Sequence, residues 1–180
     1  LVLQGNRGMS QKSAAPGNAS YYYSFTRLPA RGSLKMNDGE TQLVSGQAWM
    51  DREWSTSALA HDQVGWHWFS IQLDDQSELM FYQLRRQDGS VDPNSAGTSV
   101  NPHGETYQLG AQDVVIEPID FWTNPRGISY PVRWRIEVPG ESLTLELDAY
   151  VLDQELDHSV RYWEGAMSVH GTRANQPVAG

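Results

Sequence analysis

Segments in which large apolar residues alternate with polar ones dominate this 180-residue chain. Residues 131–138 place Val132, Trp134 and Ile136 at alternate positions, and residues 142–151 repeat the pattern with leucines. Side chains of a strand point alternately to its two faces, so a period of two gathers these apolar residues on one face. The pattern therefore predicts half-buried strands, each with one wet side.

Strand-like segments recur along the chain and are separated by turn sequences. Strands are predicted at 20–28, at two places within 40–54, at 65–73, from the next turn to residue 86, and at 113–119, 131–138, 141–150 and 160–171. Asp88-Gly89 and Pro139-Gly140 are strong turn signals. A spacing of roughly 8–12 residues between strands is typical of a sandwich or barrel, so an all-β fold with little helix is predicted.

Three segments depart from this pattern. Residues 1–18 are rich in glycine, serine and glutamine and are predicted to be an irregular lead-in. Residues 86–105 are polar and contain Pro93 and Pro102, so a long loop is predicted there. Residues 151–158 are expected to form a helical turn or two.

Composition and charge argue against several classes of function. The net charge is −9 at pH 7, and lysine and arginine form no basic stripe, so nucleic acid is not an expected partner. Without cysteine the chain has no disulfide, thiolate metal site or cysteine nucleophile. The five histidines show neither HxH nor HExxH spacing, so no metal site is predicted. The sequence also has no phosphate-binding glycine loop and no dinucleotide fingerprint, so no cofactor is predicted.

Most of the seven tryptophans stand beside acidic residues. In the densest cluster, Trp49, Asp51 and Glu53 are two residues apart, so on a strand their side chains share one face. A carboxylate held against indole rings loses solvation, which favours its protonated form and lets it act as a general acid near neutral pH. The competing interpretation is that Arg52, Arg85 or a backbone amide pairs with these acids and ties strands together.

The predicted strand at residues 65–73 has large residues on both faces. One face carries His67, Phe69, Ile71 and Leu73, and the other carries Trp66, Trp68, Ser70 and Gln72. The second face is interpreted either as the wall of a ligand cavity in a small barrel or as ordinary core packing. Glu164, between Trp163 and Gly165, is either a further acid that faces the interior or part of a glycine bulge.

Several motifs resemble those of one protein family. They are NASYYYS at 18–24, GQAWMDREWS at 46–55, GWHWFSIQL at 65–73, ELM at 78–80, LR at 84–85 and YWEGA at 162–166. Together they resemble the hydroxyneurosporene synthase (carotenoid 1,2-hydratase) family, and more closely its secreted AttH-like bacterial branch. The resemblance extends over nearly the whole chain, and the long tryptophan motifs make it specific.

The resemblance implies a fold of two lipocalin-like antiparallel β-barrel domains, of which this chain would be the second. It implies one barrel of roughly 8–10 strands in residues 19–180, with residues 1–18 as a linker or as the tail of the preceding domain. Family members run on with another strand, so the last strand of the barrel is expected to be missing after Gly180.

The resemblance implies a hydrophobic ligand, either isoprenoid or lipid-like, and leaves open whether the protein is an enzyme. The first expectation is a periplasmic or secreted binding domain associated with a membrane transporter and with a preceding lipocalin-like domain. The alternative is a hydratase that adds water to a C=C bond of a carotenoid or prenyl substrate. Such chemistry needs a desolvated acid to protonate the alkene and aromatic faces to stabilise the carbocation.

Site residues follow from these two expectations. Asp51 and Glu53 are the expected catalytic acids. The expected ligand-binding residues are Trp49, Trp54, Trp66, Trp68, Gln72, Tyr82, Trp163 and Glu164. Among these, Gln72, Tyr82 or Glu164 would orient the attacking water.

Overall fold

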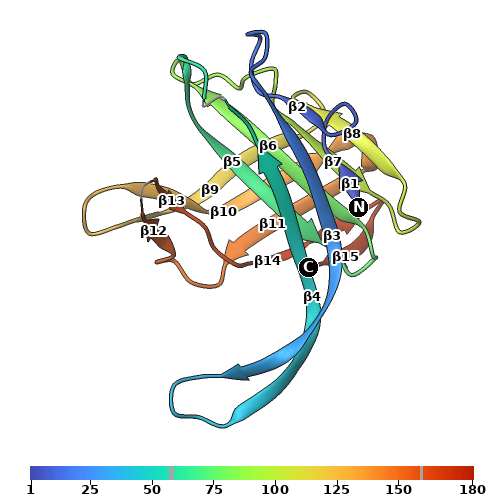
Figure 1. Ribbon diagram of the computed structural model, residues 1–180, viewed down its shortest axis with the longest axis vertical. Coiled ribbons are helices and arrows are strands. Elements are labelled where there is room, and N and C mark those ends of the chain that lie inside the picture. Colours follow the sequence, from blue (N-terminus) through green and yellow to red (C-terminus); the bar gives the residue numbers. More distant parts are fainter. Residues whose placement is uncertain (57–58, 159) are drawn as a thin grey trace. The chain divides into compact units, whose positions relative to one another are not determined.

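The computed structural model describes residues 1–56, 59–158 and 160–180, which fold almost entirely as antiparallel strands (Figure 1). Fifteen strands and one short 3-10 helix lie in these residues. Among them there is no helix with the length and apolar character needed to cross a membrane. The predicted all-β class with little helix is therefore confirmed.

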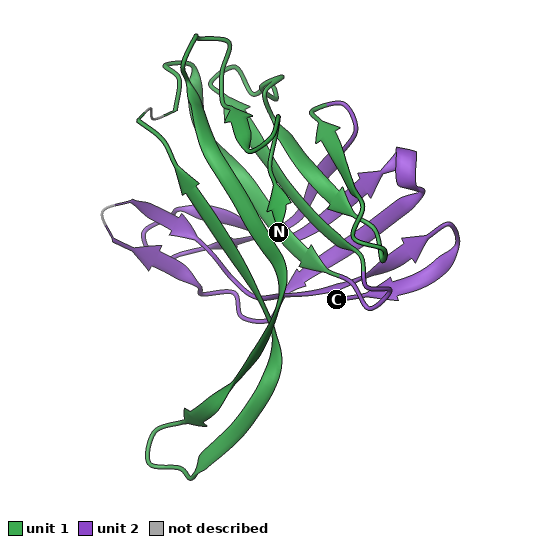
Figure 2. Ribbon diagram, turned by 45° about the vertical axis from the view of Figure 1, so that its right-hand side comes forward, with its two compact units in different colours: residues 1–72, 77–111 green, residues 73–76, 112–180 purple. Residues whose placement is uncertain are grey.

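The chain divides into two compact units, shown in green and purple in Figure 2. Unit 1 comprises Leu1–Gln72 and Ser77–Ala111, and unit 2 comprises Leu73–Gln76 and Gln112–Gly180. The short segment Leu73–Gln76 thus belongs to unit 2, although the strands on either side of it, Gln63–Gln72 and Glu78–Arg86, belong to unit 1.

The first sheet of unit 1 is built on a long hairpin. Its strands are β1 (Val2–Leu3), β2 (Met9–Gln11), β3 (Ala19–Lys35) and β4 (Thr41–Trp54). Both β1 and β2 pair with β3, and β4 pairs with β3 as well. Residues 1–18 therefore contribute two strands where an irregular lead-in was expected. Apart from Val2, the buried side chains of this segment, such as Gln4 and Ser10, are polar and hydrogen-bonded, so the sequence shows no apolar alternation here.

The β3–β4 hairpin is longer and more regular than predicted. Residues 40–54 were expected to hold two strands, but β4 is continuous. Gly46, near the middle of this segment, pairs with Ala30 inside the ladder. Beyond the part that pairs with β1 and β2, the two strands continue as an exposed two-stranded ribbon that ends in the turn before Thr41 (Figure 1).

The second sheet of unit 1 has the strand order β5-β6-β7-β8. Its strands are β5 (Gln63–Gln72), β6 (Glu78–Arg86), β7 (Ala96–Val100) and β8 (Thr106–Gly110). The predicted β5–β6 hairpin is confirmed. The prediction of a long loop at 86–105 is wrong, because β7 lies within it. Small residues hid this strand, since Gly97 packs directly against the backbone of Met80 and Phe81.

Unit 2 contains a five-stranded sheet of order β15-β14-β11-β10-β9 and a separate two-stranded sheet. The strands are β9 (Val115–Thr123), β10 (Ser129–Val138), β11 (Leu143–Ala149), β12 (Glu155–Asp157), β13 (Arg161–Trp163), β14 (Met167–Arg173) and β15 (Gln176–Ala179), with the 3-10 helix η1 (Pro139–Glu141) between β10 and β11. The predicted turn at Pro139-Gly140 is therefore confirmed. The predicted apolar face of β10 is buried at Val132, Trp134 and Ile136.

Two predictions in unit 2 are wrong. Residues 151–158 contain β12 and no helical turn, because the Glu155 carboxylate accepts hydrogen bonds from Tyr130, Asn124 and Arg126 and holds this segment extended. The single strand predicted at 160–171 is divided into β13 and β14. A side chain at Gly165, between the two strands, would overlap atoms of Gln154 and Trp163.

The predicted closed barrel differs from the observed pairing. The described strands form four separate sheets, and no strand pairing among them closes a sheet on itself. There are also more strands than the roughly 8–10 expected of one small barrel, since β1, β2, β7 and β12 are short strands with weak sequence patterns.

The close packing at Gly97 yields a test of the β6–β7 pairing. A Cβ atom there would overlap the Met80 backbone oxygen and the Phe81 backbone, which cannot move without disturbing the sheet. We expect Gly97→Ala to lower the free energy of unfolding by about 2–3 kcal/mol. Gly46→Ala is the matched control, because nothing lies near its Cβ position. Urea denaturation of both variants measures the difference, and equal stabilities would contradict the close approach of β7 to β6.

Candidate functional site

The β3–β4 hairpin gathers chemically active side chains on one face. Ser24 pairs with Asp51 and Tyr22 pairs with Glu53, and directly paired residues of an antiparallel ladder share a face. Trp49 packs against a buried cluster that includes Tyr22 and the second sheet of unit 1. As predicted, Trp49, Asp51 and Glu53 therefore lie on the same side of β4.

Glu53 is held by two donors. The Ser20 hydroxyl donates a 2.5 Å hydrogen bond to its carboxylate, and Lys12 Nζ lies 2.8 Å from Oε1. The observed partner of Glu53 is Lys12, and not the predicted Arg52 or Arg85. Sequence reasoning missed Lys12 because it lies in the segment interpreted as a lead-in. Lys12 is thus the cation that pairs with this carboxylate.

Lys12 itself lies between two aromatic rings. Its Nζ is 3.8 Å from the Tyr82 ring centroid and 5.3 Å from that of Tyr22, which are cation–π distances. Only 18% of its side chain is exposed. Burial lowers the pKa of Lys12, and the adjacent Glu53 carboxylate opposes this shift.

Asp51 is surrounded by neutral donors. It accepts a hydrogen bond from the Ser24 hydroxyl, and it lies near the Tyr22 hydroxyl. Trp68 Nε1 in turn donates to the Tyr22 hydroxyl at 3.1 Å. Burial raises the pKa of Tyr22 well above its usual value, and the charge of Asp51 adds to this, so the phenol keeps its proton. No lysine or arginine of the described ranges forms an ion pair with Asp51, in contrast to Glu53.

Tyr82 and Gln72 have structural partners. The Tyr82 hydroxyl shares a 2.7 Å hydrogen bond with Ser10, and burial raises the pKa of Tyr82 to about 12. The Gln72 amide donates to the Thr26 carbonyl at 2.6 Å. Gln72 therefore joins β5 to β3, and its amide is occupied in tying strands together.

The tryptophan face of β5 is half open. Trp66 pairs with Leu84 and Trp68 pairs with Tyr82, so both tryptophans lie on the face that bears the buried cluster. They nevertheless remain 48% and 37% exposed, respectively. In addition, Trp49 Nε1 is buried without a hydrogen-bond acceptor within the described residues. Exposed indoles and an unsatisfied buried donor are both features that a bound molecule would relieve.

Three expected ligand-binding residues have other surroundings. Trp54 stacks on Tyr21 with ring centroids 5.6 Å apart, and this pair lies on the face of the hairpin opposite to Asp51. Trp163 and Glu164 belong to unit 2. There Trp163 Nε1 donates to the Leu152 carbonyl at 2.7 Å, and Glu164 interacts with Tyr162.

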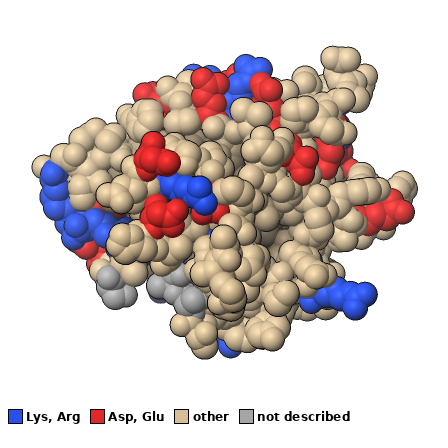
Figure 3. All heavy atoms as spheres, turned by 90° about the horizontal axis from the view of Figure 1, so that it is seen from above, with Lys and Arg blue, Asp and Glu red and all other residues tan. Residues whose placement is uncertain are grey.

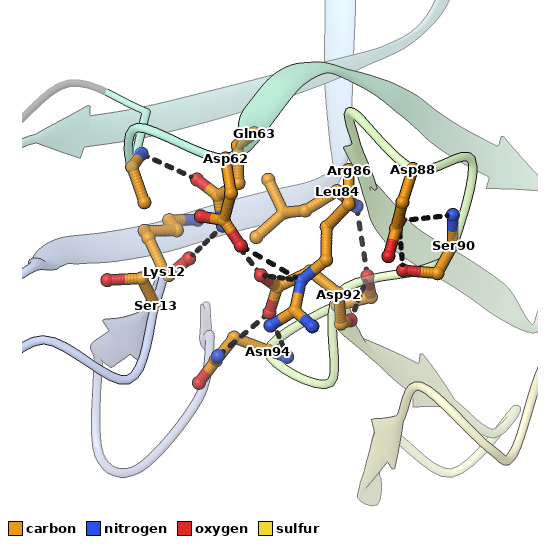
Figure 4. Close-up of polar contacts among 12 residues, drawn as sticks. Lys12, Ser13, Asp62, Gln63, Leu84, Arg86, Asp88, Ser90, Asp92 and Asn94 are labelled. Atoms are coloured by element: carbon orange, nitrogen blue, oxygen red, sulfur yellow. Dashed lines mark hydrogen bonds and ion pairs between the residues drawn. The ribbon is translucent and has the colours of Figure 1, made fainter.

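A second polar cluster in unit 1 surrounds Asp92 (Figure 4). Its carboxylate accepts hydrogen bonds from the Asn94 backbone and side chain at 2.8 Å, from Arg86 at 3.0 Å and from Gln63 at 3.1 Å. Only 2% of the Asp92 side chain is exposed. A cavity of about 380 Å³ beside it is lined by Asp62, Arg86, Gln87 and Asp88. Because the donors are mutually satisfied, this cluster anchors the segment between β6 and β7.

Acidic and basic side chains are intermixed on the face drawn in Figure 3, and most of that face is uncharged. The described part of the chain contains no group of three or more histidine, aspartate or glutamate residues that could hold a metal ion.

Comparison with known proteins identifies relatives of the whole chain. A model of the AttH-like family matches residues 1–179. The crystal structure of a protein assigned as AttH from Nitrosomonas europaea is 36% identical, with a TM-score of 0.85, over 99% of this chain and 55% of that one. Kievitone hydratase from Nectria haematococca shares the fold at 20% identity, with a TM-score of 0.79 and the same coverage. The chain thus spans about half the length of these two proteins. No curated protein matches it.

The Asp92 cluster is expected to make the free energy of unfolding depend on pH in the acidic range. Burial opposes its ionisation, but the hydrogen bonds from Asn94, Gln63 and Arg86 outweigh burial and lower the pKa of Asp92 to about 2. A carboxyl group with a lowered pKa stabilises the fold above the unfolded-state pKa and loses this contribution as the pH falls. We expect Asp92 to contribute about 2 kcal/mol at neutral pH, lost between about pH 4 and pH 2.

Urea denaturation at several pH values tests this expectation. Asp92→Asn should lower stability at pH 7 and flatten its dependence on pH in the acidic range. Asp38→Asn, in the exposed turn between β3 and β4, is the control and should follow the unaltered protein. An Asp92→Asn curve parallel to that of the unaltered protein would refute the linkage.

Proposed function

The chain belongs to the AttH-like family, and from this premise we propose that unit 1 binds an apolar small molecule against the tryptophan face of β5. The single observation that carries this proposal is the exposure of Trp66 and Trp68 on the same face as Tyr82 and the buried cluster. An indole on that face would normally be covered, and covering 100 Å² of apolar surface is worth about 2.5 kcal/mol.

The polar groups around these indoles are already oriented. The Tyr22 hydroxyl fixes the Trp68 ring through the 3.1 Å bond to Nε1, and Ser24 fixes Asp51. A mostly apolar wall with a few fixed polar groups is typical of small-molecule sites. A lipid-like or isoprenoid molecule that carries one polar group matches this arrangement.

Tryptophan fluorescence tests the location of the site. Titration with farnesol, a small isoprenoid alcohol, should quench emission of the protein. Trp68→Phe should reduce the quenching and weaken binding by about tenfold, because part of the contact area is removed. Trp54→Phe removes an indole from the opposite face of the hairpin and should leave the affinity within about twofold. Equal effects of the two substitutions would place the ligand elsewhere.

A second candidate function is hydration of a C=C bond, favoured by the two adjacent carboxyl groups beside the indole wall. One carboxylic acid would transfer its proton to an alkene carbon, and the electron pair of the C=C bond would form the new C–H bond. Indole faces would stabilise the resulting carbocation. Water would then form the C–O bond and return a proton to the carboxylate. Kievitone hydratase has a similar fold, which supports this candidate function. The hydratase activity itself is known only as a property of that protein.

Substitution of the carboxyl groups tests the hydratase candidate. Asp51→Asn and Glu53→Gln should each lower the rate of water addition to a prenyl alkene by at least ~100-fold, because general acid–base catalysis is worth 10²–10⁴-fold. Mass spectrometry of reactions in ¹⁸O-labelled water measures the added oxygen. Circular dichroism of each variant checks that the fold is retained. If both folded variants hydrate the probe at the rate of the unaltered protein, hydration does not depend on these groups.

Further proposals rest on the resemblance of the tryptophan motifs. They are membership of the hydroxyneurosporene synthase branch, a position as the second of two lipocalin-like domains, a periplasmic or secreted location, and association with a transporter. The extra length of the two similar structures is compatible with a second domain. These statements stay predictions.

A further inference from the structure

We propose that the site in unit 1 selects neutral apolar molecules that carry a hydroxyl group and discriminates against the corresponding carboxylates. This inference rests on the proposed binding function and names its ligand class. It follows from the charges of three side chains on one face, Asp51, Glu53 and Lys12, and from the way in which they are paired.

The one cation of this group is already neutralised. Lys12 Nζ is 2.8 Å from the Glu53 carboxylate and lies over the Tyr82 ring at 3.8 Å. An incoming carboxylate would have to compete with Glu53 for Lys12. The ion pair leaves Asp51 as the uncompensated charge, so the site carries a net charge of −1 from these three groups.

The neighbouring titratable groups do not cancel this charge. Arg27 pairs with the buried Glu78 at 2.5 Å. Tyr22 keeps its proton because burial and Asp51 raise its pKa, and Tyr82 keeps its proton as well. His67 lies on the other face of β5, and burial together with Arg85 lowers its pKa to about 4, so it is neutral at pH 7.

The hydrogen-bonding groups favour a hydroxyl. Asp51 accepts a hydrogen bond from Ser24, and a carboxylate has room for further donors. Trp49 Nε1, two residues away on the same face, is a buried donor with no acceptor in the described part of the chain. A hydroxyl can donate to Asp51 and accept from Trp49, whereas a carboxylate can only accept. Like charges brought together in a partly buried site repel strongly.

A matched pair of probes tests the selectivity. Farnesol and farnesoic acid share one hydrocarbon chain, and the acid is ionised at pH 7.5. Tryptophan quenching should show farnesol binding on the order of 100-fold more tightly than farnesoic acid at low salt. Equal affinities would overturn the selectivity and leave the proposed binding function intact. Binding of neither probe would overturn both.

Two substitutions should change the ratio of affinities in opposite directions. Glu53→Gln frees Lys12 to pair with a ligand carboxylate, so it should raise the affinity for farnesoic acid relative to farnesol by at least ~10-fold. Lys12→Met leaves two carboxylates unpaired and should lower that ratio. Asp38→Asn is a charge control in an exposed turn and should not change it.

Opposite changes in the affinity ratio would indicate electrostatic selection. A loss of structure would instead weaken the binding of both probes together. Circular dichroism identifies a variant that does not fold. If Lys12→Met does not fold, the affinity ratio of Glu53→Gln alone tests the proposal. A ratio that Glu53→Gln leaves unchanged would overturn it.

Discussion

The ion pair between Lys12 and Glu53 is the contact on which the candidate site depends. A lysine that lies between the rings of Tyr22 and Tyr82 loses hydration, and a carboxylate at 2.8 Å compensates part of that loss. Because Glu53 belongs to β4, the same contact holds residues 1–18 against the long hairpin. The ladders with β3 set the position of the two short strands, and the ion pair sets the orientation of a carboxylate and the charge of the site.

Strand alternation divides one motif between two environments. Trp49, Asp51 and Glu53 share the inner face of β4, whereas Trp54 is an odd number of residues from each of them and points to the other face, where it stacks on Tyr21. The residues that form one tryptophan–acid cluster in the sequence are thus divided between the two faces of β4. Only the inner part brings carboxylates near the exposed indoles of β5, and only that part bears on the proposed ligand binding.

Much of the fold could be predicted because it depends on local alternation. The buried face of β10 and the β5–β6 hairpin follow directly from period-two patterns. What could not be predicted depends on contacts between segments far apart in the chain. The strand that contains Gly97 forms because the backbone of β6 packs closely against it. Lys12 belongs to the candidate site because it pairs with Glu53 of β4. Neither local sequence contains a sign of its distant partner.

The two candidate functions draw on the same charge imbalance. With Glu53 neutralised by Lys12, the remaining charge is on Asp51, next to the phenol of Tyr22 and the Trp68 ring that this phenol fixes. A partly buried site with a net negative charge repels an anion, and the same charge attracts a developing cation. Selection of a neutral alcohol or alkene and stabilisation of a carbocation are therefore compatible demands on one arrangement. Hydration would make one further demand, because its first step needs a carboxyl group in the protonated form, whereas repulsion of an anion needs the ionised form.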